Sequence, residues 1–149
     1  ETSSRLFTEV REKRGLCYAV NAGYSGGRDR GMVSLYAGST PERAQETLDT
    51  MLAELVRFEQ GIDEGELRRA VVGMKSRLIM QGESTAARAA ALGSDWYRLG
   101  RCRSLGELAQ EVDSVTLGGL NAWIAQSMGS AWRKGMTMCS VGKTEPRTT

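Results

Sequence analysis

The sequence predicts an α+β domain in which a largely antiparallel sheet is covered on one face by a layer of helices. Residues 16–25 and 32–38 alternate with a period of two, and the short glycine-rich link between them predicts a hairpin. Residues 40–128 instead repeat apolar side chains every three or four positions, which is typical of amphipathic helices. Residues 135–142 alternate again and predict a third strand, so the expected order is α-β-β-α-α-α-α-α-β.

The chain is expected to begin with a short helix. The hydroxyl groups of Ser3 and Ser4 can cap this helix, which is predicted to run to about Lys13. Gly15 then supplies the left-handed conformation that commonly ends a helix. Tyr18 therefore lies near the start of the strand that follows.

Five helices are expected after the hairpin, each with its own start signal. The expected N-caps are Thr40, Asp63, Ser84, Ser104 and Thr116. Thr40 precedes a proline suited to the first helical position, and Asp63 and Ser104 are each followed three residues later by a glutamate, which makes a capping box. Gly82 is expected to break or bend its helix. The alanine-rich surface at residues 86–91 predicts close packing inside the helical layer.

Length and composition predict one domain over residues 1–149. The chain is 40% apolar and 26% charged, as ordinary globular proteins are, and residues 143–149 are expected to form a loose tail. The net charge of +2 is too balanced for the basic surface of a dedicated nucleic-acid-binding protein. No apolar run approaches the roughly 18 residues that a membrane span needs, so we expect no span.

Histidine is absent from the chain and cysteine is scarce. The three cysteines, Cys17, Cys102 and Cys139, are too few and too widely spaced for a disulfide framework or a cysteine-based zinc site. We expect them to act as small buried apolar residues. Without histidine, most zinc-hydrolase sites, Ser-His-Asp triads and Cys-His dyads are impossible within this chain. Catalysis must use carboxylates, lysine, tyrosine or arginine, or groups supplied from elsewhere.

The densest polar segment, residues 4–18, contains the main candidate functional pair. Arg11 falls near the end of the first helix, and Tyr18 opens the strand seven residues later. A helix end, a glycine turn and a strand start can bring these side chains over one cleft. There a guanidinium and a phenol are suited to bind carbonyl or oxyanion oxygens. The alternative is a solvated basic cluster at a helix C-terminus beside a half-buried strand aromatic, and spacing alone favours this alternative.

Other motifs point to structural roles. Residues 23–31 superficially suggest a phosphate-binding loop, but they lack a GK[ST] sequence and lead into a strand instead of a helix. Arg28 and Arg30 are therefore expected to be charges at the hairpin tip. The tryptophans are expected to be core or interface anchors; they are Trp96, Trp123 and Trp132.

The opening segment also resembles a known family. Residues 3–20 read SSRLFTEVREKRGLCYAV, which closely resembles a signature of the pitrilysin/insulinase family of zinc metallopeptidases. That family includes the mitochondrial processing peptidases and many bacterial zinc proteases. The resemblance continues in the expected order and covers nearly the whole chain. It includes Tyr36–Gly38, Thr40–Glu42, Glu83–Arg88 and Val141–Gly142.

The resemblance implies an enzyme built from related α+β domains that face each other as two halves of a clam-shell chamber. One half carries the inverted zinc motif H-x-x-E-H with a distal glutamate. The facing half has lost the zinc ligands and contributes an arginine and a tyrosine seven residues apart, which are Arg11 and Tyr18 here. The resemblance therefore implies that this chain is the substrate-binding, chamber-forming half of a zinc metalloendopeptidase. It would be inactive alone, with the zinc in a partner catalytic half or subunit.

The chain departs from the family pattern in two ways. It has no H-x-x-E-H motif, and it lacks the strand and helix that normally precede the Ser-Arg-Leu segment. We therefore expect the latter part of a non-catalytic half-domain that is N-terminally incomplete. Missing strands would leave an unpaired sheet edge, so we expect the isolated fragment to self-associate. Two other hypotheses remain: a non-enzymatic structural or assembly subunit that keeps the fold, and an autonomous helical module that binds a protein partner.

Overall fold

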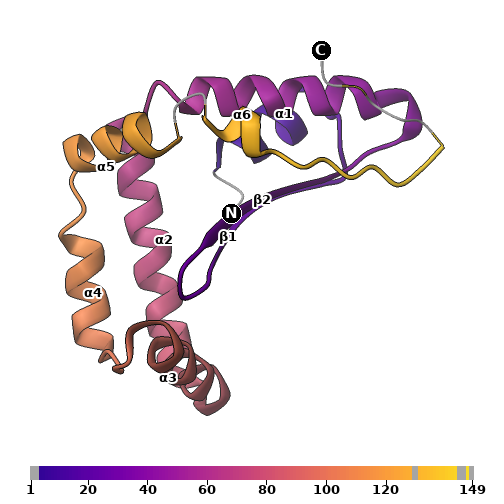
Figure 1. Ribbon diagram of the computed structural model, residues 1–149. Coiled ribbons are helices and arrows are strands. Elements are labelled where there is room, and N and C mark those ends of the chain that lie inside the picture. Colours follow the sequence, from indigo (N-terminus) through magenta and orange to yellow (C-terminus); the bar gives the residue numbers. More distant parts are fainter. Residues whose placement is uncertain (1–3, 129–130, 144–146, 148–149) are drawn as a thin grey trace. The chain divides into compact units, whose positions relative to one another are not determined.

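The computed structural model describes residues 4–128, 131–143 and 147 (Figure 1). These residues form two compact units. Among the described residues, the first unit draws on 4–25, 32–61, 121–128, 131–143 and 147, and the second on 26–31 and 62–120.

The described residues form helices and a two-stranded antiparallel sheet, which agrees with the predicted α+β class. In chain order the elements are η1 (Phe7–Glu12), β1 (Ala19–Gly26), β2 (Gly31–Gly38), η2 (Pro41–Arg43), α1 (Ala44–Phe58), α2 (Glu64–Glu83), α3 (Thr85–Leu99), α4 (Leu105–Asp113), α5 (Leu117–Trp123), η3 (Ile124–Met128) and α6 (Ala131–Gly135). Within the described ranges, no helix has both the length and the apolar character needed to cross a bilayer.

The first helix forms where the sequence predicts it. Ser4 Oγ accepts a hydrogen bond from the backbone N–H of Phe7 (3.3 Å), which confirms Ser4 as a cap, whereas Ser3 lies outside the described residues. From Phe7 the helix continues as the wider π-helical turn η1. Gly15, with φ of 59°, has the left-handed conformation that was predicted to end the helix.

The first strand begins at Ala19, later than the predicted start at Leu16. The backbone of Leu16 is already engaged, because its N–H donates to the carbonyl of Val10 (3.0 Å) and its carbonyl accepts from the hydroxyl of Thr47 (3.2 Å). Leu16 and Cys17 are also buried. Because the N–H and the carbonyl of Leu16 are already hydrogen-bonded to Val10 and Thr47, they cannot pair with a neighbouring strand.

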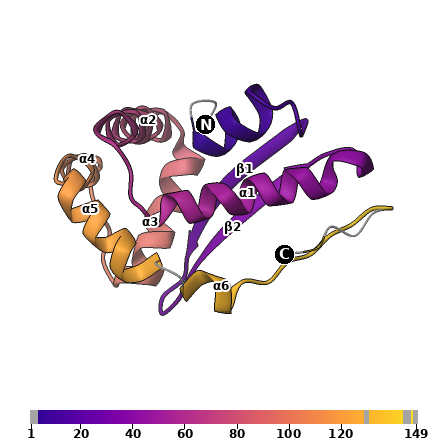
Figure 2. The same ribbon diagram turned by 90° about the horizontal axis from the view of Figure 1, so that it is seen from above.

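β1 and β2 form the predicted hairpin, and η1 and α1 lie side by side over its base (Figures 1 and 2). The core of the first unit is a cluster of buried apolar side chains with further apolar side chains packed against it. The buried members are Val10, Leu16, Cys17 and Met51, and the packed members are Leu6, Val20, Leu35 and Ala37. Strand residues are thus packed against helix residues at the base of the hairpin.

The prediction of a third strand at residues 135–142 is wrong. Gly135 ends helix α6, and residues 136–143 form neither helix nor strand; within the described ranges the sheet has two strands. The alternation in this segment does not correspond to one buried face, since Met136, Met138 and Val141 are 40%, 43% and 96% exposed. A strand needs a neighbouring strand for its backbone hydrogen bonds, and an alternating sequence does not provide one.

The helix predicted at Thr40 starts at that position. Thr40 has extended backbone angles, Pro41 opens the short helix η2, and α1 follows directly. The Thr40 side chain accepts no backbone hydrogen bond, so the start is confirmed but the hydroxyl cap is not. α1 turns Thr47, Thr50 and Met51 inward, and all three are buried.

Three capped helices make up most of the second unit, where α2 packs against α3 and α4. The capping boxes predicted at Asp63 and Ser104 are both present, and Ser84 Oγ accepts from the backbone N–H of Ala87 (3.2 Å). The expected interruption near Gly82 is present but falls slightly later, because α2 continues to Glu83. Ser84 makes the break instead, since its extended backbone lets its side chain cap α3.

Two expectations of burial are wrong within this chain. Ala86, Ala89 and Ala90 on α3 are exposed, so the alanine-rich surface is not in the interior. Cys17 is buried as predicted, but Cys102 and Cys139 are exposed. Composition shows that a side chain is small enough to pack closely, but it does not show whether a neighbour is present.

The helix predicted at Thr116 is capped as expected. Thr116 Oγ1 accepts a hydrogen bond from the N–H of Gly119 (3.2 Å), at the start of α5.

Polar side chains attach the last described segments to α1. After α6, the side-chain amide of Gln45 pairs twice with the backbone of Arg147: its oxygen accepts from the Arg147 N–H, and its nitrogen donates to the Arg147 carbonyl, both at 2.8 Å. The indole N–H of Trp132 donates to the carboxylate of Glu59, just beyond the end of α1.

Candidate functional site

Arg11 lies in the last turn of η1 and is exposed. Its guanidinium carbon is 5.0 Å from the centroid of the Phe7 ring, which lies one helical turn earlier. This distance is within the range of a cation–π contact, so the ring favours one orientation of the cation. Within the described residues, Arg11 makes no ion pair with a carboxylate. Its donors are therefore directed to solvent.

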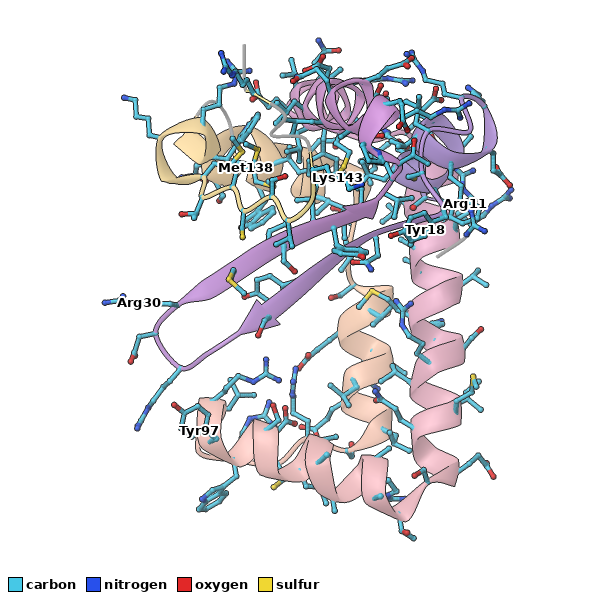
Figure 3. All side chains as sticks on the ribbon, turned by 90° about the vertical axis from the view of Figure 1, so that its right-hand side faces the viewer. Arg11, Tyr18, Arg30, Tyr97, Met138 and Lys143 are labelled. Carbon is cyan, nitrogen blue, oxygen red and sulfur yellow. The ribbon has the colours of Figure 1, made fainter. Side chains whose placement is uncertain are left out.

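Tyr18 lies immediately before β1, and its residue is 68% exposed. Its backbone N–H donates to the carbonyl of Gly38 at the end of β2 (2.9 Å), so the main chain at Tyr18 is attached to the sheet. Figure 3 shows Arg11 and Tyr18 at the same end of the hairpin. Neither side chain is enclosed in the core, and both can be reached from solvent.

The turn between the two residues is held from α1. An Nη of Arg43 donates to the carbonyl of Gly15, and the hydroxyl of Thr47 contacts the carbonyls of Leu16 (3.2 Å) and Arg43 (2.8 Å). Thr47 is only 3% exposed. Neither Arg43 nor Thr47 was expected from the sequence to contribute to this turn. A buried hydroxyl on the apolar stripe of an amphipathic helix was the available signal, because such a group requires a partner.

Two charged residues near Arg11, Glu9 and Lys13, pair with each other. The ammonium group of Lys13 lies 2.7 Å from the carboxylate of Glu9, and this hydrogen bond lowers the pKa of Glu9. Burial raises the pKa of the Cys17 thiol, and the positive charge of Arg11 opposes that shift. Glu9 is thus engaged by Lys13, and Arg11 remains available to bind an anionic oxygen.

The described side chains offer no group of ligands for a catalytic zinc ion. The sequence contains no histidine. Throughout the described ranges, no three cysteine, aspartate or glutamate side chains gather closely enough to hold a metal ion. Zinc sites of hydrolases commonly use histidine with a carboxylate or cysteine, and this chain has no histidine to contribute.

A shallow depression on the second unit offers little chemistry. It has a volume of about 320 Å³ and is lined by Glu107, Gln110, Glu111 and Ser114. Its two carboxylates already have cationic partners, Arg101 for Glu107 and Arg103 for Glu111. Hydrogen bonds from the Ser104 backbone and the Arg101 side chain lower the pKa of Glu107. These glutamates therefore serve the helix cap and the local ion pairs.

Comparison with known families gives one match that includes both candidate residues. The profile described as "Peptidase M16 inactive domain" matches residues 1–74. An uncharacterized zinc protease of Bacillus subtilis is 35% identical over 127 residues, which is 83% of this chain and 31% of that protein. An uncharacterized zinc protease of Streptomyces coelicolor is 36% identical over 115 residues, or 76% of this chain and 25% of that protein. The chain thus spans less than a third of each of these relatives.

Solved structures share the fold at lower sequence identity. A chain of complex III2 from Candida albicans has a TM-score of 0.73 at 21% identity, covering 84% of this chain and 30% of that one. The peptidase M16 inactive domain from Pseudomonas fluorescens has a TM-score of 0.68 at 23% identity and covers 85% and 30%. The periplasmic protease PqqL of Escherichia coli has a TM-score of 0.61 at 23% identity and covers 81% and 14%.

Proposed function

Because the chain belongs to the M16 peptidases, the pitrilysin/insulinase family, we propose that it is the substrate-binding, chamber-forming half of a zinc metalloendopeptidase that hydrolyses peptides. The observation that carries this proposal is the match of an inactive peptidase domain to residues 1–74, the segment that contains Arg11 and Tyr18. The relatives named zinc proteases support a hydrolase as the assembled protein. This chain supplies a binding surface to that enzyme.

The proposed role of Arg11 and Tyr18 is to bind the peptide carbonyl oxygen that gains negative charge during hydrolysis. A guanidinium is permanently cationic and offers a planar set of donors, and a phenol donates one O–H. Donors that are oriented before the reaction stabilise an oxyanion without reorganising in the transition state. The exposure of Tyr18 and the contact of Arg11 with Phe7 support this role, since both donors are accessible and Arg11 is already oriented.

The proposed partner is a catalytic half that carries the zinc ligands. The aligned region covers 31% of the Bacillus relative, so most of that protein lies outside the match and has room for a second domain. The absence of histidine here supports ligands supplied by another domain or subunit. The isolated chain would then be inactive.

Substitutions in the complete zinc protein test the proposal. Tyr18→Phe removes one donor, and we expect kcat/KM for a peptide substrate to fall about a hundredfold, the usual cost of losing an oxyanion-hole donor. Arg11→Ala should lower turnover to a similar extent. Tyr24→Phe and Arg30→Ala are the matched controls, because they make equivalent changes at exposed positions on the same hairpin. Both controls should keep the wild-type rate.

Zinc content separates loss of binding from loss of the metal. We expect Arg11→Ala and Tyr18→Phe to retain the zinc stoichiometry of the wild-type protein, measured by atomic emission. Wild-type turnover in both variants would refute the role of the pair. Loss of zinc together with activity would instead show that these residues are needed to keep the zinc site of the partner half intact.

A non-enzymatic assembly subunit is the second candidate. The observation that favours it is the structural similarity to a chain of complex III2 from Candida albicans, with a TM-score of 0.73. An assembly role gives a distinct result, since replacing both Arg11 and Tyr18 would leave the activity of the associated complex unchanged.

A further inference from the structure

Gly38, the last residue of β2, is buried beneath the Tyr18 side chain. A Cβ atom built on Gly38 would lie 2.6 Å from both Cε2 and Cζ of Tyr18, and 2.7 Å from the phenol oxygen. These separations are well inside van der Waals contact. The reactive end of Tyr18 therefore occupies the space that any other residue at position 38 would fill.

The backbone at Gly38 does not itself require glycine. The glycines with positive φ are Gly15, Gly61, Gly100 and Gly142, and Gly38 is not among them. Alanine could therefore adopt the same backbone angles without strain. What excludes a side chain at this position is the phenol of Tyr18.

The main chain on both sides of this contact is fixed. The N–H of Tyr18 donates to the carbonyl of Gly38 (2.9 Å), and the turn before Tyr18 is held by Arg43 and Thr47 from α1. Thr47 is buried and lies on a helix that packs against η1. The Cα of Tyr18 is thus set by the sheet and α1, which leaves the orientation of its ring to be set by Gly38.

We propose that Gly38 is a positioning residue for Tyr18: the missing side chain lets the phenol rest on the strand and fixes where its hydroxyl points. This inference rests on the proposed function only for its catalytic consequence. A methyl group at position 38 would displace the phenol, because the ring is the exposed and movable partner in the contact. Gly38→Ala should therefore move the hydroxyl and leave the fold intact.

Nuclear magnetic resonance of the 149-residue chain tests the contact without any activity. A proton over an aromatic ring is shifted upfield, so we expect the Gly38 Hα resonances to move downfield in Tyr18→Leu. In Gly38→Ala we expect the Tyr18 ring signals to move, observed with ¹³C-labelled tyrosine and assigned with Tyr18→Phe. Gly23→Ala is the matched control, because the nearest atom to its Cβ would be Ser34 Oγ at an ordinary 3.6 Å.

The spectra decide the proposal in either direction. Unchanged Tyr18 ring signals in Gly38→Ala, or unchanged Gly38 Hα signals in Tyr18→Leu, would overturn it. If Gly38→Ala does not fold, the Tyr18→Leu spectrum decides alone, since it leaves Gly38 in place.

Turnover of the complete zinc protein tests the catalytic consequence. Gly38→Ala should lower kcat/KM roughly tenfold to a hundredfold, the range for a misplaced catalytic group, with a near-unchanged melting temperature. Added to Tyr18→Phe, it should cause little further loss, because the hydroxyl that it displaces is already absent. Equal losses in both backgrounds would overturn the positioning role. Wild-type turnover in Tyr18→Phe would refute the proposed catalytic role of Tyr18 and leave the contact observed by spectroscopy unaffected.

Discussion

The carboxylate of Asp95 accepts three hydrogen bonds from Arg103. The backbone N–H and Nε of Arg103 donate to one oxygen (3.0 and 3.1 Å), and Nη2 donates to the other (2.7 Å). Asp95 is 5% exposed, and Arg103 also binds Glu111 on α4. Both oxygens of this buried carboxylate accept hydrogen bonds, so the Asp95–Arg103 pair holds the segment between α3 and α4 in place. Removing Asp95 would take away the main counter-charge of the Arg103 guanidinium.

Asp95→Asn should destabilise the chain by about 2 to 3 kcal/mol. The amide keeps the shape but loses the charge that Arg103 requires, and the cost stays below that of a fully buried pair because Arg103 retains Glu111. Urea unfolding followed by circular dichroism measures the change. Asp113→Asn is the matched control, because Asp113 pairs with Lys75 at an exposed position and should cost less than 1 kcal/mol. Equal costs for the two variants would contradict a structural role for the buried pair.

The contribution of Asp95 should disappear in acid. Its hydrogen bonds from Arg103 hold its pKa below the ordinary value of about 4, so the unfolded state takes up its proton first as the pH falls. The stabilisation is therefore complete above about pH 4 and is lost as the pH falls through the folded-state pKa. The difference in unfolding free energy between wild type and Asp95→Asn should shrink over that interval. A difference that stays constant between pH 6 and pH 2 would refute this linkage.

Two glycines on one helix should respond to alanine with opposite signs. Gly100 ends α3 with φ of 68°, and Gly93 lies within α3; a Cβ at either position would have no neighbour within 4 Å. Gly100→Ala should destabilise the chain by about 1 kcal/mol because alanine is strained in the left-handed region. Gly93→Ala should stabilise it by about 0.5 to 1 kcal/mol because alanine favours a helix. Thermal melts of the two variants check the prediction, and shifts of the same sign would contradict it.

The isolated chain should self-associate through its hairpin. Each strand of the two-stranded sheet has one unpaired edge within the described ranges, and Tyr24, Met32 and Val33 are 74%, 62% and 50% exposed. Sedimentation velocity should show a mass that rises with concentration. Met32→Lys should weaken the association. Val72→Lys, which adds the same charge to α2 at a position 60% exposed, should not. A wild-type chain that stays monomeric at every concentration would contradict this prediction.

Local signals allowed the sequence to locate most helix starts. The capping boxes at Asp63 and Ser104, the serine cap of α3 and the left-handed Gly15 all depend on residues within a few positions of each other. The predictions that were wrong depend on distant partners. Residues 135–142 have the pattern of a strand but no ladder, and Leu16 is kept out of β1 by hydrogen bonds to Val10 and Thr47.

The candidate site illustrates the same limit. Spacing alone favoured a solvated role for Arg11 and Tyr18, and the family resemblance selected them as a pair. The contact of Tyr18 with Gly38 joins positions twenty residues apart across the hairpin. Nothing near Gly38 in the sequence marks that contact, because a glycine at the end of a strand has several ordinary explanations.

The two bonds from Gln45 to residue 147 involve only main-chain atoms of that residue. The amide acts as an extra rung of backbone pairing, with one donor and one acceptor presented together. These hydrogen bonds do not depend on the side chain at position 147, except that proline has no N–H to donate. Other substitutions at that position would leave both hydrogen bonds in place. Gln45→Glu would instead remove the amide N–H donor and place a carboxylate oxygen against the carbonyl oxygen of residue 147, which would repel it.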